Sequence, residues 1–415
     1  MRKLFVAASL GGVALAGIAI AAAGGNLAKS GGGMILLPAS TGTTSPAASI
    51  QASPAALADG SQVDANGKIA DSYICVFRAG AVGRGSERAE ANRSANAAGG
   101  SVGHVYGHAL QGFSVRASAR GVEMMRRNNQ RIDYCEQDQV MAIVDPVQAL
   151  AQPGGGVSTA STQVTPPGIA LVNAAGATNF SGTAWVIDTG VDLDHPDLNV
   201  DTARSTSFVS REKTADDGNG HGTHVSGTIG AINNTFGVVG VAAGARVVGV
   251  KVLSRSGSGT NSGVIAGVDY VKSRAAIGDV ANMSLGGGVS TALDSAVISA
   301  AQAGIRFAVA AGNSSADANT SSPARANHPN IYTIAAFSPT TLLWASFSNW
   351  GQPPVDYAEP GLNIHSTWKD GGYNTISGTS MASPHMAGIL MFGGPRSTRT
   401  VTRTNTTDVY LIGII

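Results

Sequence analysis

The sequence predicts an α/β protein, preceded by a small α+β unit. Of its 415 residues, 55 are glycine and only 5% are aromatic, a composition that favours tight turns and close contacts between helices and a sheet. Two apolar runs, Ala184–Ile187 and Ile305–Ala311, predict buried strands. With 43% hydrophobic residues, a chain of this length can form two folded units.

The N-terminus has the pattern of a secretory signal. Arg2 and Lys3 precede an apolar run that ends in small residues before Gly24. We therefore expect residues 1–23 to be a signal peptide and the protein to be secreted. The run is also long enough to cross a bilayer, so an uncleaved membrane anchor is the alternative.

Two further stretches are poor in residues that could form a core. Residues 24–67 are rich in Gly, Ala, Ser, Thr and Pro and predict a flexible linker. Residues 148–168 are rich in Gly and Pro and predict a connector between the two folded units. The formal net charge of +1 argues against a nucleic-acid partner, and nothing indicates an obligate oligomer, so we expect a monomer.

Residues 68–147 predict the small α+β unit. Its elements follow the order β-α-β-β-α-β, which packs as a split βαβ sheet with helices on one face. The expected elements are a strand at 73–77, a helix at 85–98, two strands within 102–115 that turn at Gly112, a helix at 121–128 and a strand at 132–140. This fold supports many functions, and a freestanding ferredoxin-like binding domain is one reading.

Both cysteines, Cys75 and Cys135, lie on the first and last strands expected in this unit. An even count and export permit a disulfide, and the two strands would be neighbours, but the sequence leaves the bond open. The rest of the chain has no cysteine, which excludes a thiol nucleophile there.

Two candidate catalytic residues lie where a strand ends or a helix begins. Asp188 follows the strand Ala184–Ile187, and carboxyl ends of strands are where open α/β sheets keep their sites. Ser380 lies between small residues at the expected start of a helix, where the helix dipole favours a nucleophile. Taken alone, Asp188 could be a turn residue and Ser380 an ordinary N-cap.

Two more candidates come from glycine-rich segments. His221 is flanked by Gly220 and Gly222 at the expected start of another helix. His221 and His224 are three residues apart, so a zinc site is the competing interpretation, although no Glu or Cys lies nearby. Asn313 follows a buried strand, where its amide could donate to a developing oxyanion.

The order Asp188, His221, Asn313, Ser380, each within its local motif, resembles the subtilisin-like serine proteases and is most similar to their proteinase K branch. The resemblance covers about residues 167–391. It implies a subtilisin-like three-layer catalytic domain at 169–415 with a mostly parallel central sheet. It also implies a triad of Asp188, His221 and Ser380 and an oxyanion donor, Asn313. It also implies proteins and peptides as substrates and no cofactor for catalysis.

The small unit resembles the inhibitory propeptide of the same family. The similar segments are Tyr73–Phe77, His104–Tyr106, Leu110–Phe113 and Tyr134–Asp138. The resemblance implies that residues 68–147 assist folding and then inhibit the enzyme as an intramolecular partner. Activation would be a cleavage between residues 145 and 161.

The resemblance also suggests a substrate groove. Gly257, Ser258 and Gly259 are similar to its edge strand, and Ser284, Leu285 and Gly286 to its opposite wall. An extended peptide would bind there by β-strand addition. The glycines suggest a pocket that prefers apolar or aromatic residues, although turn chemistry explains them equally well.

Pro329, Ile331 and Asp356 align with a calcium site of the proteinase K branch, formed by two carbonyl oxygens and one carboxylate. A solvated Asp356 in a loop is the alternative. The C-terminus departs from the family: we expect the helix of Ser380 to stop near Phe392 and the apolar tail to add a strand.

Together these observations predict a secreted serine endopeptidase made as a self-processing zymogen. A catalytically silent, surface-anchored binding protein of the same fold is the rival interpretation, which the unusual C-terminus keeps open.

Overall fold

The computed structural model describes residues 61–143 and 162–415. The predicted signal peptide, most of the predicted linker and the expected activation cleavage at 145–161 lie outside these residues. Within the described part of the chain, no helix is both long and apolar enough to cross a membrane.

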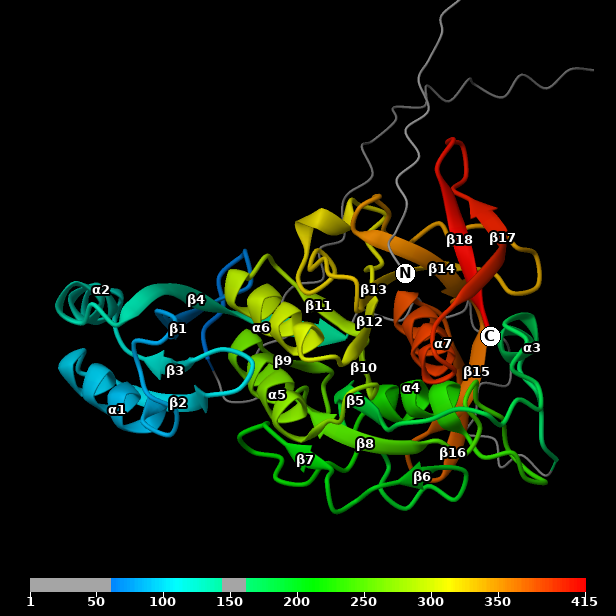
Figure 1. Ribbon diagram of the computed structural model, residues 1–415, viewed down its shortest axis with the longest axis horizontal. Coiled ribbons are helices and arrows are strands. Elements are labelled where there is room, and N and C mark those ends of the chain that lie inside the picture. The colour runs from blue at the N-terminus through cyan, green and yellow to red at the C-terminus, as the bar shows by residue number, and fades with distance from the viewer. Residues whose placement is uncertain (1–60, 144–161) are drawn as a thin grey trace, which may run out of the picture. The chain divides into compact units, whose positions relative to one another are not determined.

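Residues 61–143 form an antiparallel sheet with strand order β4-β1-β3-β2 and two helices that pack on the same buried cluster (Figure 1). The elements are β1 (Lys68–Phe77), α1 (Glu87–Ala97), β2 (Ser101–Tyr106), β3 (Gly112–Arg116), α2 (Ala119–Asn128) and β4 (Ile132–Ile143). The predicted element order is therefore confirmed. Alternate side chains of β1 and β3 meet apolar side chains of the helices in this core.

One detail of the prediction was wrong: Gly112 does not form the turn between β2 and β3. It is the first residue of β3, and the chain turns at residues 107–111. A Cβ atom on Gly112 would lie 2.4 Å from the carbonyl oxygen of Cys75, so glycine lets β3 approach β1 closely. Cys75 and Cys135 are direct partners in the pairing of β1 with β4, and a disulfide joins them.

The second part is built on a ten-stranded sheet of order β17-β18-β14-β13-β12-β10-β5-β8-β6, with β7 also paired to β8. Every pairing in it is parallel except that of β17 with β18, which confirms the expected mostly parallel sheet. Its strands are β5 (Ala184–Asp188), β6 (Asn199–Val200), β7 (Thr206–Ser207), β8 (Arg246–Lys251), β10 (Val280–Met283), β12 (Arg306–Ala310), β13 (Ile331–Phe337), β14 (Val355–Pro360), β17 (Arg396–Thr402) and β18 (Val409–Ile414).

Helices cover both faces of this sheet and give three layers. Side chains of β5 alternate between two cores: Val186 joins the core beneath α4 and α7, while Trp185 and Ile187 join the core beneath α5 and α6. The helices are α3 (Pro167–Leu171), α4 (His221–Gly230), α5 (Asn261–Arg274), α6 (Thr291–Gln302) and α7 (Thr379–Met391), with a short 3₁₀ turn at Ala318–Thr320. Short strands β9 (Ser258–Thr260) and β11 (Leu285–Gly287) and a hairpin of β15 (Ile364–Trp368) and β16 (Gly372–Ile376) lie outside the main sheet.

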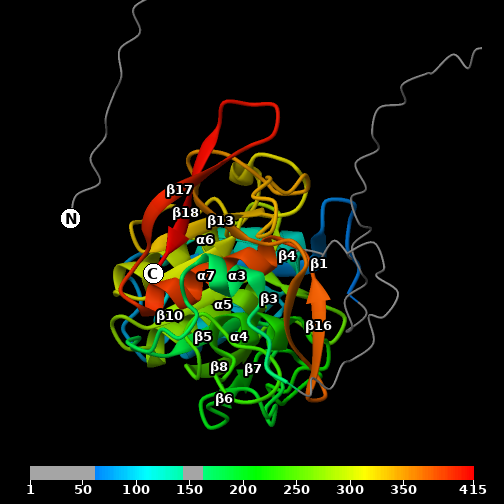
Figure 2. The same ribbon diagram turned by 90° about the vertical axis from the view of Figure 1, so that its right-hand side faces the viewer.

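The C-terminal segment extends the sheet, as expected. Helix α7 ends at Met391, and β18 then pairs in parallel with β14 (Figure 1). Strand β17 pairs with β18 at the edge of the sheet (Figure 2). The buried ring of Tyr410 on β18 stacks on Trp344, with 4.7 Å between ring centroids. This contact anchors the added strands in a small core that they share with β13 and β14.

Candidate active site

Asp188 ends strand β5, and two neighbouring groups contact one oxygen of its carboxylate. Its Oδ1 accepts a hydrogen bond of 2.7 Å from the N–H of Thr189 and lies 2.8 Å from Nδ1 of His221. The side chains of Asp188 and His221 are both buried. Asp188 is therefore placed to hold the His221 ring with its proton on Nδ1 and its Nε2 directed away from the carboxylate.

His221 begins helix α4, which starts very close to the turn after β5. A Cβ atom on Gly222 would lie only 2.0 Å from the carbonyl oxygen of Gly190, so a glycine is required beside the histidine. The N-cap of α4 is Gly220, and the carboxylate of Asp217 binds this helix start: it accepts from the N–H of Gly220 at 3.0 Å and from that of Thr223 at 2.9 Å. These contacts fix the first turn of α4 and with it the backbone of His221.

The zinc interpretation of His221 and His224 is wrong in this structure. Nε2 of His224 lies 3.0 Å from the carbonyl oxygen of Ile364, and its ring packs edge-on against Trp368. Burial lowers the pKa of His224 to about 3, so the ring is neutral. His224 thus attaches α4 to the neighbouring hairpin, while His221 contacts Asp188.

Ser380 is the second residue of α7, and the N-cap position belongs to Gly378. The capping interpretation of Ser380 is therefore wrong. Its Oγ donates to the carbonyl oxygen of Ser284 at 3.2 Å, and the Ser284 hydroxyl donates to the Ser380 carbonyl at 2.8 Å. Helices α4 and α7 pack together, so the first turns that carry His221 and Ser380 belong to one packed pair of helices.

The side chain of Asn313 is oriented by the start of the same helix. Its Oδ1 accepts from both the N–H and the hydroxyl of Thr379, at 2.9 and 2.8 Å. A Cβ atom on Gly378 would lie 3.0 Å from Nδ2 of Asn313, so the glycine keeps this amide close to the turn before Ser380. With Oδ1 engaged, the donor Nδ2 faces the turn that leads to the serine.

The two predicted walls of the groove are strands β9 and β11, and β4 lies between them. Met141 and Ala142 pair antiparallel with Gly259 and Ser258 of β9, while Ala142 also pairs with Gly286 of β11. The N–H of Ile143 donates to the Gly257 carbonyl at 2.8 Å. The end of β4 therefore occupies the groove by strand addition on both sides, as an extended peptide would.

Glycines make room for this strand. A Cβ atom on Gly257 would lie 2.9 Å from a methyl carbon of Ile143, and one on Gly287 would lie 2.5 Å from the sulfur of Met141. Both sides of the groove therefore have glycine where β4 projects the side chains of Ile143 and Met141. The predicted wall residues Gly257, Ser258, Gly259, Ser284, Leu285 and Gly286 all lie along these two segments.

Residues 185–392 match the Peptidase S8 model, described as the subtilase family, across the segment that holds all four candidate catalytic residues. The chain belongs to the subtilase family. The match confirms the resemblance inferred from the sequence, and the fold of residues 162–415 is the subtilisin-like one.

Named relatives are similar to this subtilase over most of its length. Alkaline serine exoprotease A of Vibrio alginolyticus is 46% identical over 293 residues, which are 69% of this chain and 52% of that protein. Subtilisin-like serine protease AsES of Sarocladium strictum is 42% identical over 294 residues, 70% of this chain and 72% of that one. Proteinase R of Parengyodontium album is 36% identical over 336 residues, 80% and 81% of the two chains.

Acidic side chains join the N-terminal unit of the subtilase to two of its helices. Glu136 of β4 accepts from the N–H groups of Thr291 and Ala292 at the start of α6, at 3.1 and 3.3 Å. Asp138 accepts from the N–H and hydroxyl of Ser262 at the start of α5, at 3.1 and 2.5 Å. Each carboxylate therefore meets the positive end of a helix dipole, but burial outweighs the bonds from Ser262 and raises the pKa of Asp138.

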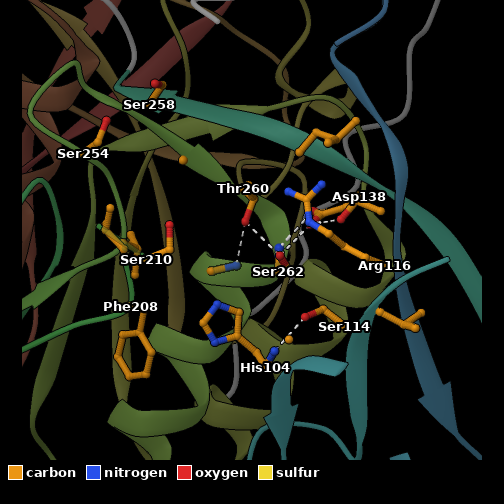
Figure 3. Close-up of a pocket in the computed structure, with 18 residues that line it drawn as sticks. His104, Ser114, Arg116, Asp138, Phe208, Ser210, Ser254, Ser258, Thr260 and Ser262 are labelled. Carbon is orange, nitrogen blue, oxygen red and sulfur yellow. Dashed lines mark hydrogen bonds between the residues drawn. The ribbon is translucent and has the colours of Figure 1, made fainter. Parts of the chain in front are cut away.

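A third carboxylate belongs to one of these helices and accepts hydrogen bonds from the N-terminal unit. Asp269 of α5 accepts from three consecutive N–H groups, those of Gly107, His108 and Ala109, in the β2–β3 turn. A cavity of about 240 Å³ lies beside these contacts, lined by His104 and Asp138 of the first unit and by Phe208 of the second (Figure 3). Burial in this interface lowers the pKa of His104, whose ring faces Phe208 with 6.2 Å between centroids.

The predicted calcium ligands lie at neighbouring strand ends. Ile331 begins β13, Pro329 lies two residues before it, and Asp356 is on the adjacent β14. Oδ2 of Asp356 accepts from the N–H of Thr333 at 3.2 Å, which places the carboxylate beside the start of β13. Two carbonyl oxygens and a carboxylate are hard donors that suit calcium.

A second oxygen-rich cluster escaped the sequence analysis. Nε2 of Gln163 lies 2.9 Å from the Ile232 carbonyl, 3.4 Å from Oδ1 of Asn234 and 3.5 Å from the Val238 carbonyl. Asp197 accepts from Nδ2 of Asn234 at 2.7 Å. One amide nitrogen thus faces three oxygens, with a carboxylate beside them, and such a donor set also suits calcium. Every residue has a main-chain carbonyl, so such ligands cannot be recognised in a sequence. Only the side chains of Asp197, Gln163 and Asn234 could have indicated this cluster.

Proposed function

We propose that this subtilase is a secreted serine endopeptidase that hydrolyses peptide bonds of proteins through an acyl-enzyme. The observation that carries the proposal is the Asp188–His221 contact at the first turn of α4, packed against the helix that carries Ser380. Ser380 is a weak nucleophile unless a base takes its proton. A neutral imidazole held by a buried carboxylate is such a base.

The proposed reaction follows from these positions. Oγ of Ser380 attacks the scissile carbonyl carbon, and its proton moves to Nε2 of His221. Asp188 stabilises the resulting imidazolium through Nδ1–H. His221 then gives the proton to the leaving amine, and a water molecule hydrolyses the acyl-enzyme with His221 again as the base.

The tetrahedral intermediates carry a negative oxygen that needs donors fixed in advance. We assign this role to Nδ2 of Asn313 and the N–H of Ser380. Thr379 supports the assignment because it binds Oδ1 of Asn313 and so fixes which end of the amide remains as donor.

We propose that residues 68–147 are the intramolecular inhibitor of this enzyme. The end of β4 fills the groove between β9 and β11, and three carboxylates join the two parts. A substrate could not enter that groove while β4 is paired on both sides. Activation would then require a cleavage beyond Ile143, in residues 145–161, and release of the segment.

The test is to express residues 25–415 and the Ser380→Ala variant and to follow chain mass and hydrolysis of an apolar peptide. We expect the wild-type chain to shorten near residues 145–161 and to gain activity, while the variant stays full length, because only the wild type has the nucleophile. A wild-type protein that folds but neither shortens nor cleaves the peptide would contradict the proposal and favour the silent binding protein.

We also propose structural calcium at two positions, one formed by Pro329, Ile331 and Asp356 and one around Asp197. Chelation should lower the melting temperature, because an ion that binds only the folded state stabilises it by mass action. Asp356→Ala and Asp197→Asn should each remove part of this shift, and the double variant should not respond to the chelator. Asp201→Asn is the control that keeps the shift, and a wild type unaffected by chelation would exclude both sites.

A further inference from the structure

A buried lysine lies directly behind the triad, and the proposed mechanism does not use it. Lys251 ends β8 opposite Asp188 in the β5–β8 pairing, and its side chain has no exposed surface. Its Nζ forms an ion pair of 2.9 Å with Oε2 of Glu212, which is 14% exposed. Apolar replacements of such buried pairs are often neutral or stabilising, so stability alone is a weak account of this one.

The lysine holds the turn that follows Asp188. Its Nζ donates to the carbonyl oxygen of Thr189. The N–H of that same residue donates to Oδ1 of Asp188, and its hydroxyl accepts from the N–H of Gly222 at 2.9 Å. A change in the position of Thr189 would therefore move both the carboxylate and the start of helix α4.

The glutamate reaches His221 by a separate chain of hydrogen bonds. Oε1 of Glu212 accepts from the N–H of Arg255 at 3.0 Å, and the carbonyl oxygen of Arg255 accepts from Nδ2 of Asn219 at 3.0 Å. Oδ1 of Asn219 accepts in turn from the N–H of His221 at 3.2 Å. Partial burial alone would raise the pKa of Glu212, but bonds from Arg255 and Lys251 outweigh it and lower the pKa, so the Glu212 carboxylate is charged.

We propose that Glu212 and Lys251 are a positioning pair that fixes Asp188 relative to His221: Lys251 holds the carboxylate side through Thr189, and Glu212 holds the imidazole side through Arg255 and Asn219. The inference rests on the proposed function, since it assigns the pair a role in that reaction. The pair touches neither the substrate nor the reacting atoms, so its effect is on the orientation of the catalytic base.

The test compares three variants of the processed enzyme. Lys251→Met should lower kcat by about 10- to 100-fold with KM within about twofold of wild type, because a small misplacement of a catalytic group costs that much. Lys251→Met/Glu212→Gln removes both charges but keeps an oxygen for the Arg255 N–H. It should recover part of the melting temperature lost in the single variant while kcat stays low. Arg204→Met breaks an ion pair with Asp201 away from the triad and should leave kcat unchanged.

A second readout does not depend on turnover: the low-field proton resonance of His221 Nδ1–H, followed by NMR. We expect it to shift or broaden in Lys251→Met and in the double variant and to be unchanged in Arg204→Met. If kcat returns together with the melting temperature in the double variant, or if the resonance is the same in all proteins, the positioning role is wrong. An inactive wild type would count against the proposed function, while the resonance would still decide this inference.

Discussion

His221→Ala is expected to fold, to remain uncleaved and to lose about 10⁶-fold in kcat, the magnitude known for subtilisin, another member of the family. The loss is large because His221, held by Asp188, is the proposed acceptor of the Ser380 proton. His224 cannot substitute, since its Nε2 is bonded to the Ile364 carbonyl and burial lowers its pKa to about 3.

The measurement is hydrolysis of a peptide substrate after processed wild-type enzyme has cleaved the variant between residues 145 and 161 and has been removed. The chain mass of the untreated variant is a second readout, of self-processing. His365→Ala is a matched control, because His365 contacts Thr375 within the β15–β16 hairpin and takes no part in the proposed chemistry. Substantial hydrolysis by His221→Ala would mean that another group acts as the base.

Asp188→Asn is expected to lower kcat by about 10⁴-fold while the fold is kept, again a magnitude from the wider class of such triads. Oδ1 of Asp188 accepts from both the Thr189 N–H and Nδ1 of His221. An asparagine that keeps its oxygen at this position can still accept from Nδ1–H, but it is neutral and stabilises the imidazolium less. An asparagine that turns its NH₂ group toward His221 donates to Nδ1 and leaves the imidazole proton on Nε2, where a base must accept one.

The loss should shrink as pH rises, because hydroxide can replace part of the missing base; this is measured as a kcat profile beside wild type. Asp201→Asn removes a partly buried carboxylate that pairs with Arg204 and serves as the control for the loss of a charge. Equal activity of Asp188→Asn and wild type at neutral pH would remove Asp188 from the proposed triad.

The sequence was informative where chemistry depends on side chains and local turns. Asp188, His221, Asn313 and Ser380 stand in short motifs with glycines. The structure places them at a strand end, at helix starts and beside the turn before Ser380. The strand added by the tail was also predictable, since an apolar run after a helix stop needs a partner to bury it.

Other features depend on contacts between distant segments, which no local pattern records. The glycine at 112 is required by the carbonyl of Cys75, not by a turn. Nothing in the local sequence marks Lys251, and its ion pair with Glu212 is formed only in the folded chain. The oxygen cluster at Gln163 is built largely from main-chain carbonyls, which every residue possesses.

This edge of the main sheet is complete only when β18 is paired with β14. Strand β14 precedes β18, its partner at this edge, by some fifty residues in the sequence. Trp344 is likewise covered by a residue far along the chain, Tyr410. A nascent chain that has not yet reached residue 409 therefore leaves one side of the sheet unpaired and a small core open. The edge of β14 and the ring of Trp344 are therefore the surfaces that a chain without residues 409–414 would present to water or to the strand edge of another molecule.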